Sequence, residues 1–266
     1  MKARIKFSKT GSMRFIGHLD VMRYFQKAFR RAKIPVSYSQ GYSPHQILSF
    51  TSPLGIGLTS DAEYMDMELD ACPEPDKMVE WMNTQMNDEI RVKDFLLLPD
   101  DAKPSMAMLS GCDYVITLKP DVQSPFRDRE WTSAKWKEFQ AQDTILILKK
   151  TKRSQKEVNI RPNIYYASGD RAEFEQMTGQ SYDNLCIDLD EFTPVLFCQL
   201  TAGSVVNIKP ELLMQAFCEY TGVNYEPLMY QIHRLEMYGD ANGKKGEVHL
   251  LHDELPCQLV PLSEYR

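Results

Sequence analysis

The order of strand-like and helix-like segments in the first hundred residues is the strongest constraint on the fold. Apolar residues at alternate positions, or in short runs between turn residues, predict strands over residues 2–8, 36–39 with 46–50, 63–69 and 90–98. Helical spacing predicts helices over 18–33 and 76–86, the first with an apolar stripe of Leu19, Met22, Phe25, Phe29 and Ala32. The resulting order, β-α-β-β-α-β, is that of the ferredoxin-like fold.

The same order recurs beyond a linker-like stretch at residues 99–108. Strands are predicted at 114–118, 185–189, 195–200 and 229–237, a hairpin at 144–150 with 157–166, and helices at 130–142 and 210–220. A chain of 266 residues is long enough for two domains. We therefore expect an α+β protein with two tandem ferredoxin-like domains, the second with extra strands: residues 1–100, residues 109–240, and a C-terminal extension at 241–266.

Several classes of protein do not fit this sequence. The first residues are basic but have no apolar stretch behind them, and no apolar run approaches a membrane span, so we expect a cytoplasmic protein without a membrane partner. The six cysteines include no C-x-x-C pair, so we expect no metal and no cofactor, and we interpret the cysteines as small buried apolar side chains. No phosphate-binding, dinucleotide-binding, zinc-protease or serine-hydrolase motif is present. The absence of these motifs favours a non-catalytic protein, although it does not exclude an enzyme of another kind.

Charge is distributed unevenly along the chain. Residues 1–50 contain ten Lys and Arg and one acid, a net charge of +9, although the whole chain carries −6. Residues 57–101 contain thirteen acids and three bases. A basic segment in an acidic protein indicates a polyanionic partner, and pairing of the two segments within the fold is the alternative.

Two basic clusters are candidates for binding RNA phosphates. Arg23, Lys27, Arg30 and Arg31 recur on one face of the first predicted helix. The run KKTKRSQK at 149–156 lies at a predicted hairpin tip, where a solvated turn is the alternative. The candidate RNA-binding residues are Arg23, Lys27, Arg30, Arg31, Lys149, Lys150, Lys152 and Arg153 for phosphates and Tyr38 and Tyr42 for stacking on unpaired bases.

Two of the five histidines are candidates for acid–base chemistry. His18 lies at the start of the first predicted helix and His45 lies in a turn, each close to the basic segment. Either could serve in phosphodiester cleavage with a nearby Tyr or Lys. The alternative is that each is an ordinary helix-start or turn residue.

Three segments together resemble a known bacterial family. They are RIKFSKTGSMRFIGHLDVMR (4–23), RRAKIPVSYSQGYSPHQILSF (30–50) and PLGIGLTSDAEYMDMEL (53–69), with KEVNIRPNI (156–164) and KPELL (209–213) further along. These segments are similar to those of the radical SAM-linked protein family, a domain of unknown function found beside, or fused to, cobalamin-binding radical SAM proteins. The resemblance implies a possible radical SAM partner. This chain itself lacks the three-cysteine loop of the radical enzymes.

Three functions follow from these observations. The first is a non-catalytic RNA-binding partner that presents tRNA or rRNA to a separate modification enzyme. The second is a metal-independent ribonuclease that uses His18 or His45. The third is a protein–protein adaptor that docks a radical SAM protein through the acidic segment at 57–101.

Overall fold

The computed structural model describes residues 1–150, 155–243, 250, 253 and 256–265. The N-terminal half contains β1 (Lys2–Lys9), α1 (His18–Ala32), β2 (Leu48–Phe50), β3 (Thr59–Glu68), α2 (Met78–Asn83) and β4 (Ile90–Leu98), with the 3₁₀-helix η1 (Gly11–Phe15) after β1. The short helix α3 (Ser105–Met108) lies in the predicted linker. The C-terminal half contains β5 (Leu109–Leu118), α4 (Arg129–Gln140), β6 (Leu146–Lys150), β7 (Gln155–Asn159), β8 (Ile164–Ser168), α5 (Arg171–Thr178), β9 (Thr193–Thr201), α6 (Pro210–Thr221) and β10 (Tyr230–Asp240), and β11 (Leu259–Pro261) follows.

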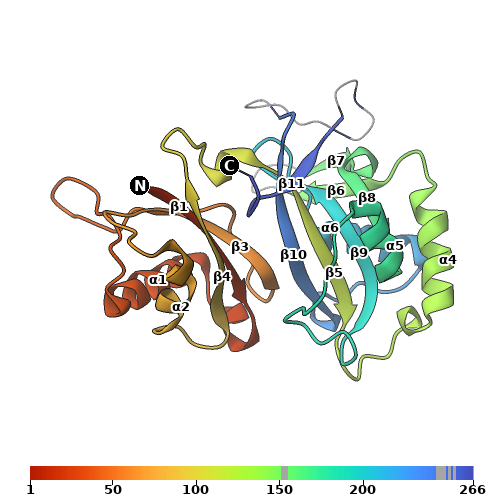
Figure 1. Cartoon of the computed structure of the whole chain (residues 1–266). Coiled ribbons are helices and arrows are strands. Elements are labelled where there is room, and N and C mark those ends of the chain that lie inside the picture. The colour runs from red at the N-terminus through yellow and green to blue at the C-terminus, as the bar shows by residue number, and fades with distance from the viewer. Residues whose placement is uncertain (151–154, 244–249, 251–252, 254–255, 266) are drawn as a thin grey trace.

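Among the described residues, nine strands form one mixed sheet. Its order is β4-β1-β3-β10-β5-β9-β8, with β2 also paired to β3 and β11 to β10. Strands β6 and β7 form a separate two-stranded sheet. Figure 1 shows the N-terminal half with α1 and α2 on the left and the C-terminal half with α4, α5 and α6 on the right.

The strand order is the same in both halves. In the N-terminal half β1 lies between β4 and β3, with β2 beyond β3; in the C-terminal half β5 lies between β10 and β9, with β8 beyond β9. Within each half these neighbours run antiparallel. The expected α+β class is therefore confirmed, whereas assigning each half to the ferredoxin-like fold stays a prediction.

The two halves meet through a short parallel contact between β3 and β10. Only two residue pairs are in register, His233 with Thr59 and Arg234 with Ser60. The C-terminal residues strengthen this joint, because the buried Arg4 of β1 donates hydrogen bonds to the carbonyl oxygens of Leu262 (3.1 Å) and Tyr265 (3.0 Å).

Helix α1 follows from its sequence pattern. Val21, Phe25, Ala28, Phe29 and Ala32 are buried at helical spacing against the core of the N-terminal half. Asp20 lies in its first turn and basic residues in its last, which complements the helix dipole. Leu19, which we predicted on the apolar stripe, is instead 66% exposed, because the stripe begins at Val21.

Other elements differ from the prediction. Residues 185–189 form an irregular segment and not a strand. The second arm of the predicted hairpin is divided, because β7 pairs with β6 whereas β8 pairs with β9. Helix α5 was not predicted, and helix α2 is shorter than expected. No helix within the described part of the chain is both long enough and apolar enough to cross a membrane.

Candidate nucleic-acid interface

The outer face of α1 carries the four predicted basic residues. Arg23, Lys27, Arg30 and Arg31 are all exposed, because the opposite face is buried in the core. We call these four residues the basic face of α1. Arg23 forms an exposed ion pair with Asp20 (3.0 Å), and Arg31 donates to the carbonyl oxygen of Gln85. Lys27 and Arg30 have no hydrogen-bond or ion-pair partner among the described residues, so their charges are available to a ligand.

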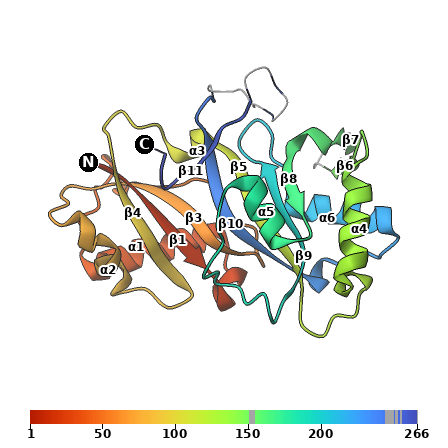
Figure 2. The same ribbon diagram turned by 45° about the vertical axis from the view of Figure 1, so that its right-hand side comes forward.

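A protruding loop lies at the same end of the molecule as α1. Residues 38–45 form this tyrosine loop, where Tyr38 is 43% exposed and Tyr42 is fully exposed. Both ends of the loop are tied to the fold, since Tyr38 bridges to Gln46 and the backbone of Ser37 pairs with that of Glu68. Figures 1 and 2 show the loop, in orange, projecting beyond the sheet on the side of α1. The loop therefore presents exposed aromatic side chains at the end of the molecule that carries α1.

The basic residues of β1 have a different role. Arg4 pairs with Asp66 (2.7 Å) and Lys6 with Glu236 (2.5 Å). Lys9 is buried and donates to the carbonyl oxygen of Ile16, and burial lowers its pKa. On β1, Arg4 therefore pairs with the acidic segment, as the alternative expects, whereas Lys6 pairs with an acid outside that segment and Lys9 has a carbonyl partner. These three residues do not contribute to the basic face of α1.

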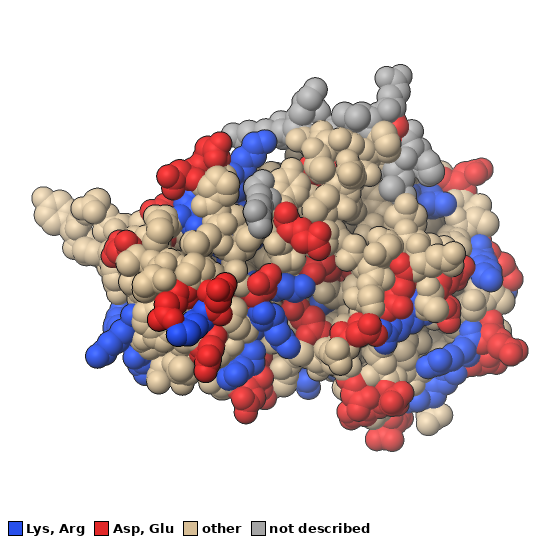
Figure 3. Space-filling view, in the orientation of Figure 1, with Lys and Arg blue, Asp and Glu red and all other residues tan. Residues whose placement is uncertain are grey.

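The acidic segment is also partly used inside the fold. Glu63 pairs with Arg234, Asp66 with Arg4 and Asp61 with His233, and Glu89 accepts hydrogen bonds from the 3₁₀-helix η1. Figure 3 shows acidic and basic side chains interspersed over one face, with basic side chains gathered at the lower left, in the region of α1 and α2. These pairs reduce the charge that an adaptor could present through residues 57–101.

The second basic cluster lies far from the first. Lys149 and Lys150 end β6 and are in register with Lys156 and Gln155 of β7. Lys152 and Arg153 lie outside the described residues. In Figures 1 and 2 the β6–β7 hairpin belongs to the C-terminal half and is well separated from α1. The two clusters therefore do not form one continuous surface.

The structure keeps the two candidate histidines apart. His18, the first residue of α1, packs edge-on against the ring of Phe50 at 5.0 Å. His45 is exposed, and its Nδ1 lies 2.8 Å from the Ser39 hydroxyl within the tyrosine loop. No hydrogen bond or ring contact between described residues joins them. His18 therefore lies at a helix start and His45 in a turn, which is the alternative to a catalytic role for these two residues.

A third histidine, which was not among the predicted site residues, lies at the centre of the sheet. His233 is fully buried, with Nδ1 2.9 Å from the Thr59 hydroxyl and Nε2 2.8 Å from Asp61 Oδ2. Burial acts to raise the pKa of Asp61, but His233 and the N–H of Cys186 outweigh it, so this pKa lies below its usual value. The signal available in the sequence was the run of polar residues His233, Arg234 and Glu236 within one predicted strand.

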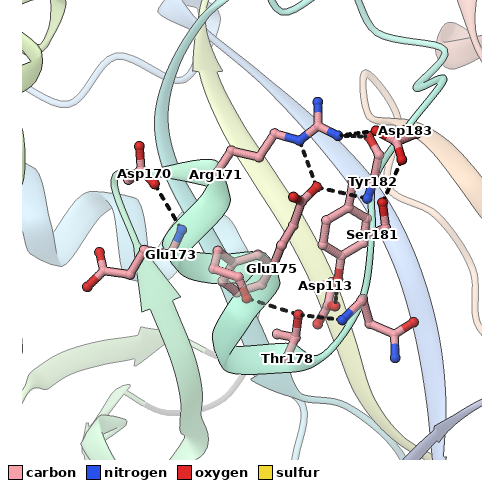
Figure 4. A network of polar contacts seen from close by, with 11 residues as sticks. Asp113, Asp170, Arg171, Glu173, Glu175, Thr178, Ser181, Tyr182 and Asp183 are labelled. Carbon is pink, nitrogen blue, oxygen red and sulfur yellow. Dashed lines mark hydrogen bonds and ion pairs between the residues drawn. The ribbon is translucent and has the colours of Figure 1, made fainter.

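Beside this joint, Asp113 of β5 is completely buried. The hydroxyls of Tyr182 and Tyr238 donate to its Oδ2, the second at 2.6 Å. Burial raises its pKa to about 7, against the lowering effect of both hydroxyls. Figure 4 shows Tyr182 reaching Asp113 from the segment after α5, where Arg171 bonds to the Tyr182 carbonyl (2.5 Å) and to Asp183 (3.2 Å). Arg171 thereby fixes this segment.

A polar cleft of about 430 Å³ opens above this network. Lys6, Asp61 and Glu236 line it from the sheet, and Tyr182, Asp183 and Asn184 line it from the segment after α5. Its charges are of both signs and largely paired, which suits a small polar molecule better than a phosphate backbone. Within the described residues, no three His, Cys, Asp or Glu side chains come together as metal ligands.

Comparison with known proteins places the chain in a family. A model of the family described as "Uncharacterized protein conserved in bacteria (DUF2344)" matches residues 2–210. The chain belongs to this family. The match includes the basic face of α1, the tyrosine loop and the β6–β7 hairpin, and it ends at the start of α6, so the family is defined by both halves of the fold.

Comparisons with curated proteins and with solved structures add little to this assignment. No curated protein matches the sequence. A chain in the solved structure titled "Crystal Structure of a Cbf5-Nop10-Gar1 Complex" aligns with 92% of this chain at 13% identity and a TM-score of 0.42. This chain spans half the length of that one. A likeness this low assigns neither fold nor function to the DUF2344 protein.

Proposed function

We propose that this protein is a non-catalytic RNA-binding partner, for tRNA or rRNA, of a separate modification enzyme. The basic face of α1 is the observation that carries the proposal. It presents four cations within a single helix face, and two of them have no partner among the described residues. Unpaired cations on a rigid element suit the phosphates of a nucleic acid.

The tyrosine loop supports RNA rather than a simple polyanion. Tyr38 and Tyr42 expose aromatic faces at the same end of the molecule as α1. Aromatic side chains stack on bases that are not paired, which is the usual mode of recognising single-stranded RNA. The basic residues of the β6–β7 hairpin are too far from α1 to belong to the same contact, so in this proposal they form a second site.

The proposal includes the partner that the resemblance implies and the location and domains that the sequence predicts. The modification enzyme would be a radical SAM protein, and both would act in the cytoplasm. The chain would consist of ferredoxin-like domains at residues 1–100 and 109–240 with an extension at 241–266, supported by the repeated strand order.

The direct test is the RNA that the protein retains in cells. Tagged full-length protein is crosslinked in bacterial cells and purified, and the attached RNA is sequenced, beside the variant Arg30→Ala/Arg31→Ala. We expect one class of RNA to be enriched and the variant to lose most of it. RNA at background level together with a bound radical SAM polypeptide would indicate an adaptor instead. Cleavage of the recovered RNA in EDTA that is lost in His18→Ala or His45→Ala would indicate a ribonuclease.

A further inference from the structure

A group of large apolar side chains is exposed where the two halves meet. Phe15 of η1 is 62% exposed, Ile56 before β3 is 67% exposed and Leu228 before β10 is 84% exposed. Exposed apolar side chains that occur singly need no explanation, whereas a contiguous group marks an interaction site.

Backbone and side-chain hydrogen bonds place the segments that carry these residues next to one another. The N–H of Gly57 donates to the carbonyl oxygen of Arg14 (2.8 Å), and the side chain of Gln231 donates to the carbonyl oxygen of Gly57 (3.0 Å). The N–H of Lys119 donates to the carbonyl oxygen of Met229 (2.9 Å). We call this surface the seam, defined by Arg14, Phe15, Ile56, Lys119 and Leu228. Figure 1 shows η1, in red, at the lower edge of the sheet beside the junction of the halves.

The seam also carries positive charge from both halves. The Arg14 guanidinium lies over the Phe15 ring, 4.8 Å from its centroid. Burial, with the charge of Arg14, lowers the pKa of Lys119. The Arg127 guanidinium donates a hydrogen bond to the carbonyl oxygen of Lys119. Among the described residues no ion pair joins Arg14, Lys119 or Arg127 to a carboxylate. Glu89 accepts hydrogen bonds from the hydroxyl of Ser12 and from the backbone N–H groups of Ser12 and Met13, and these bonds together with the nearby charge of Arg14 lower its pKa.

We infer that the seam binds an unpaired segment of the RNA, with a base stacked on Phe15 and phosphates held by Arg14 and Lys119. This inference rests on the proposed function and extends it from α1 to the C-terminal half. Single-stranded RNA offers both of the chemical groups that the seam would complement, apolar base faces and phosphates at close intervals. A protein partner would need a carboxylate opposite each cation as well as an apolar surface, and is an outcome of the test.

The test measures the affinity of full-length protein for a short single-stranded RNA and for a duplex of the same length. Phe15→Ala should weaken binding of the single strand by about five- to 150-fold, the range for loss of one stacked base, and leave duplex binding unchanged. Lys119→Gln should weaken both and lower the salt slope by about 0.7 for the single strand. Tyr220→Ala and Lys135→Gln, on α6 and α4, are the matched controls and should bind as wild type. Because Phe15 is exposed, its variant should unfold at the wild-type temperature.

The possible results separate the two claims. If Phe15→Ala and Lys119→Gln bind like wild type while Arg30→Ala/Arg31→Ala binds weakly, the seam is not used and the proposed function stands. If Phe15→Ala weakens single strand and duplex equally, stacking is wrong. If wild-type protein binds neither RNA, both claims fail, and a protein captured only when Phe15 is present would identify the seam as a protein interface.

Discussion

Arg4 and Arg30 belong to the same basic segment of the sequence, but the first is buried and paired whereas the second is exposed. Arg4 lies on β1, is 2% exposed and is neutralised by Asp66, whereas Arg30 lies on the outer face of α1 without a partner among the described residues. The difference is set by the strand and the helix that carry them. Net charge over a window therefore overstates the surface charge, and of these two elements only α1 supports a nucleic-acid interface.

The buried carboxyl group of Asp113 gives a prediction at the scale of single residues. An unfolded aspartate titrates near pH 4, whereas the pKa of Asp113 in the fold is about 7. Between these values the folded state binds more protons than the unfolded state, so the free energy of unfolding falls as pH rises, by up to about 4 kcal/mol in total. Asp113→Asn, whose amide oxygen can still accept from Tyr182 and Tyr238, should lose this contribution. Chemical unfolding of both proteins from pH 4 to pH 7 measures it, and parallel profiles would contradict it.

Regular elements with one buried face were predictable from the sequence, and elements defined by tertiary contacts were not. The starts of α1 and α6 and both bounds of β4 agree with the spacing of apolar residues, because each element packs one face on a core. Residues 185–189 are apolar at alternate positions but form an irregular segment, in which Ile187 packs with Phe174 and Phe197 in the core beside α5. The basic face of α1 followed from periodicity. His233 was missed because its partners, Thr59 and Asp61, are more than 170 positions away.

The β3–β10 joint gives the prediction at the scale of elements. Because the parallel contact is only two residue pairs long, the polar side chains there must contribute much of its strength. His233→Ala leaves Asp61 without its main partner and should lower the free energy of unfolding by about 2–5 kcal/mol. The matched control is His45→Ala, an exposed site expected to change it by less than about 0.5 kcal/mol. Denaturant unfolding measures both, and equal effects of the two substitutions would show that the pair does not hold the joint.

At the scale of the whole molecule, the fold joins two halves of the same strand order into one sheet and gives them different surfaces. The N-terminal half presents the basic face of α1 and the tyrosine loop, and the C-terminal half presents the β6–β7 hairpin and one side of the seam. An RNA held by α1 and the seam would contact both halves. Such a contact would make binding depend on the β3–β10 joint as well as on surface charge.

The central claim is that phosphates bind to the basic face of α1, and the salt dependence of RNA binding tests it most directly. The affinity of purified full-length protein for single-stranded RNA is measured over a range of salt concentrations for wild type, for Arg30→Ala/Arg31→Ala, and for the control Lys135→Ala/Lys137→Ala on α4, which removes the same charge. We predict that the α1 variant binds more weakly and that its salt slope is smaller by about 0.7 for each lost contact. The control should keep the wild-type slope. An unchanged slope in the α1 variant, or an equal loss in the control, would contradict the claim.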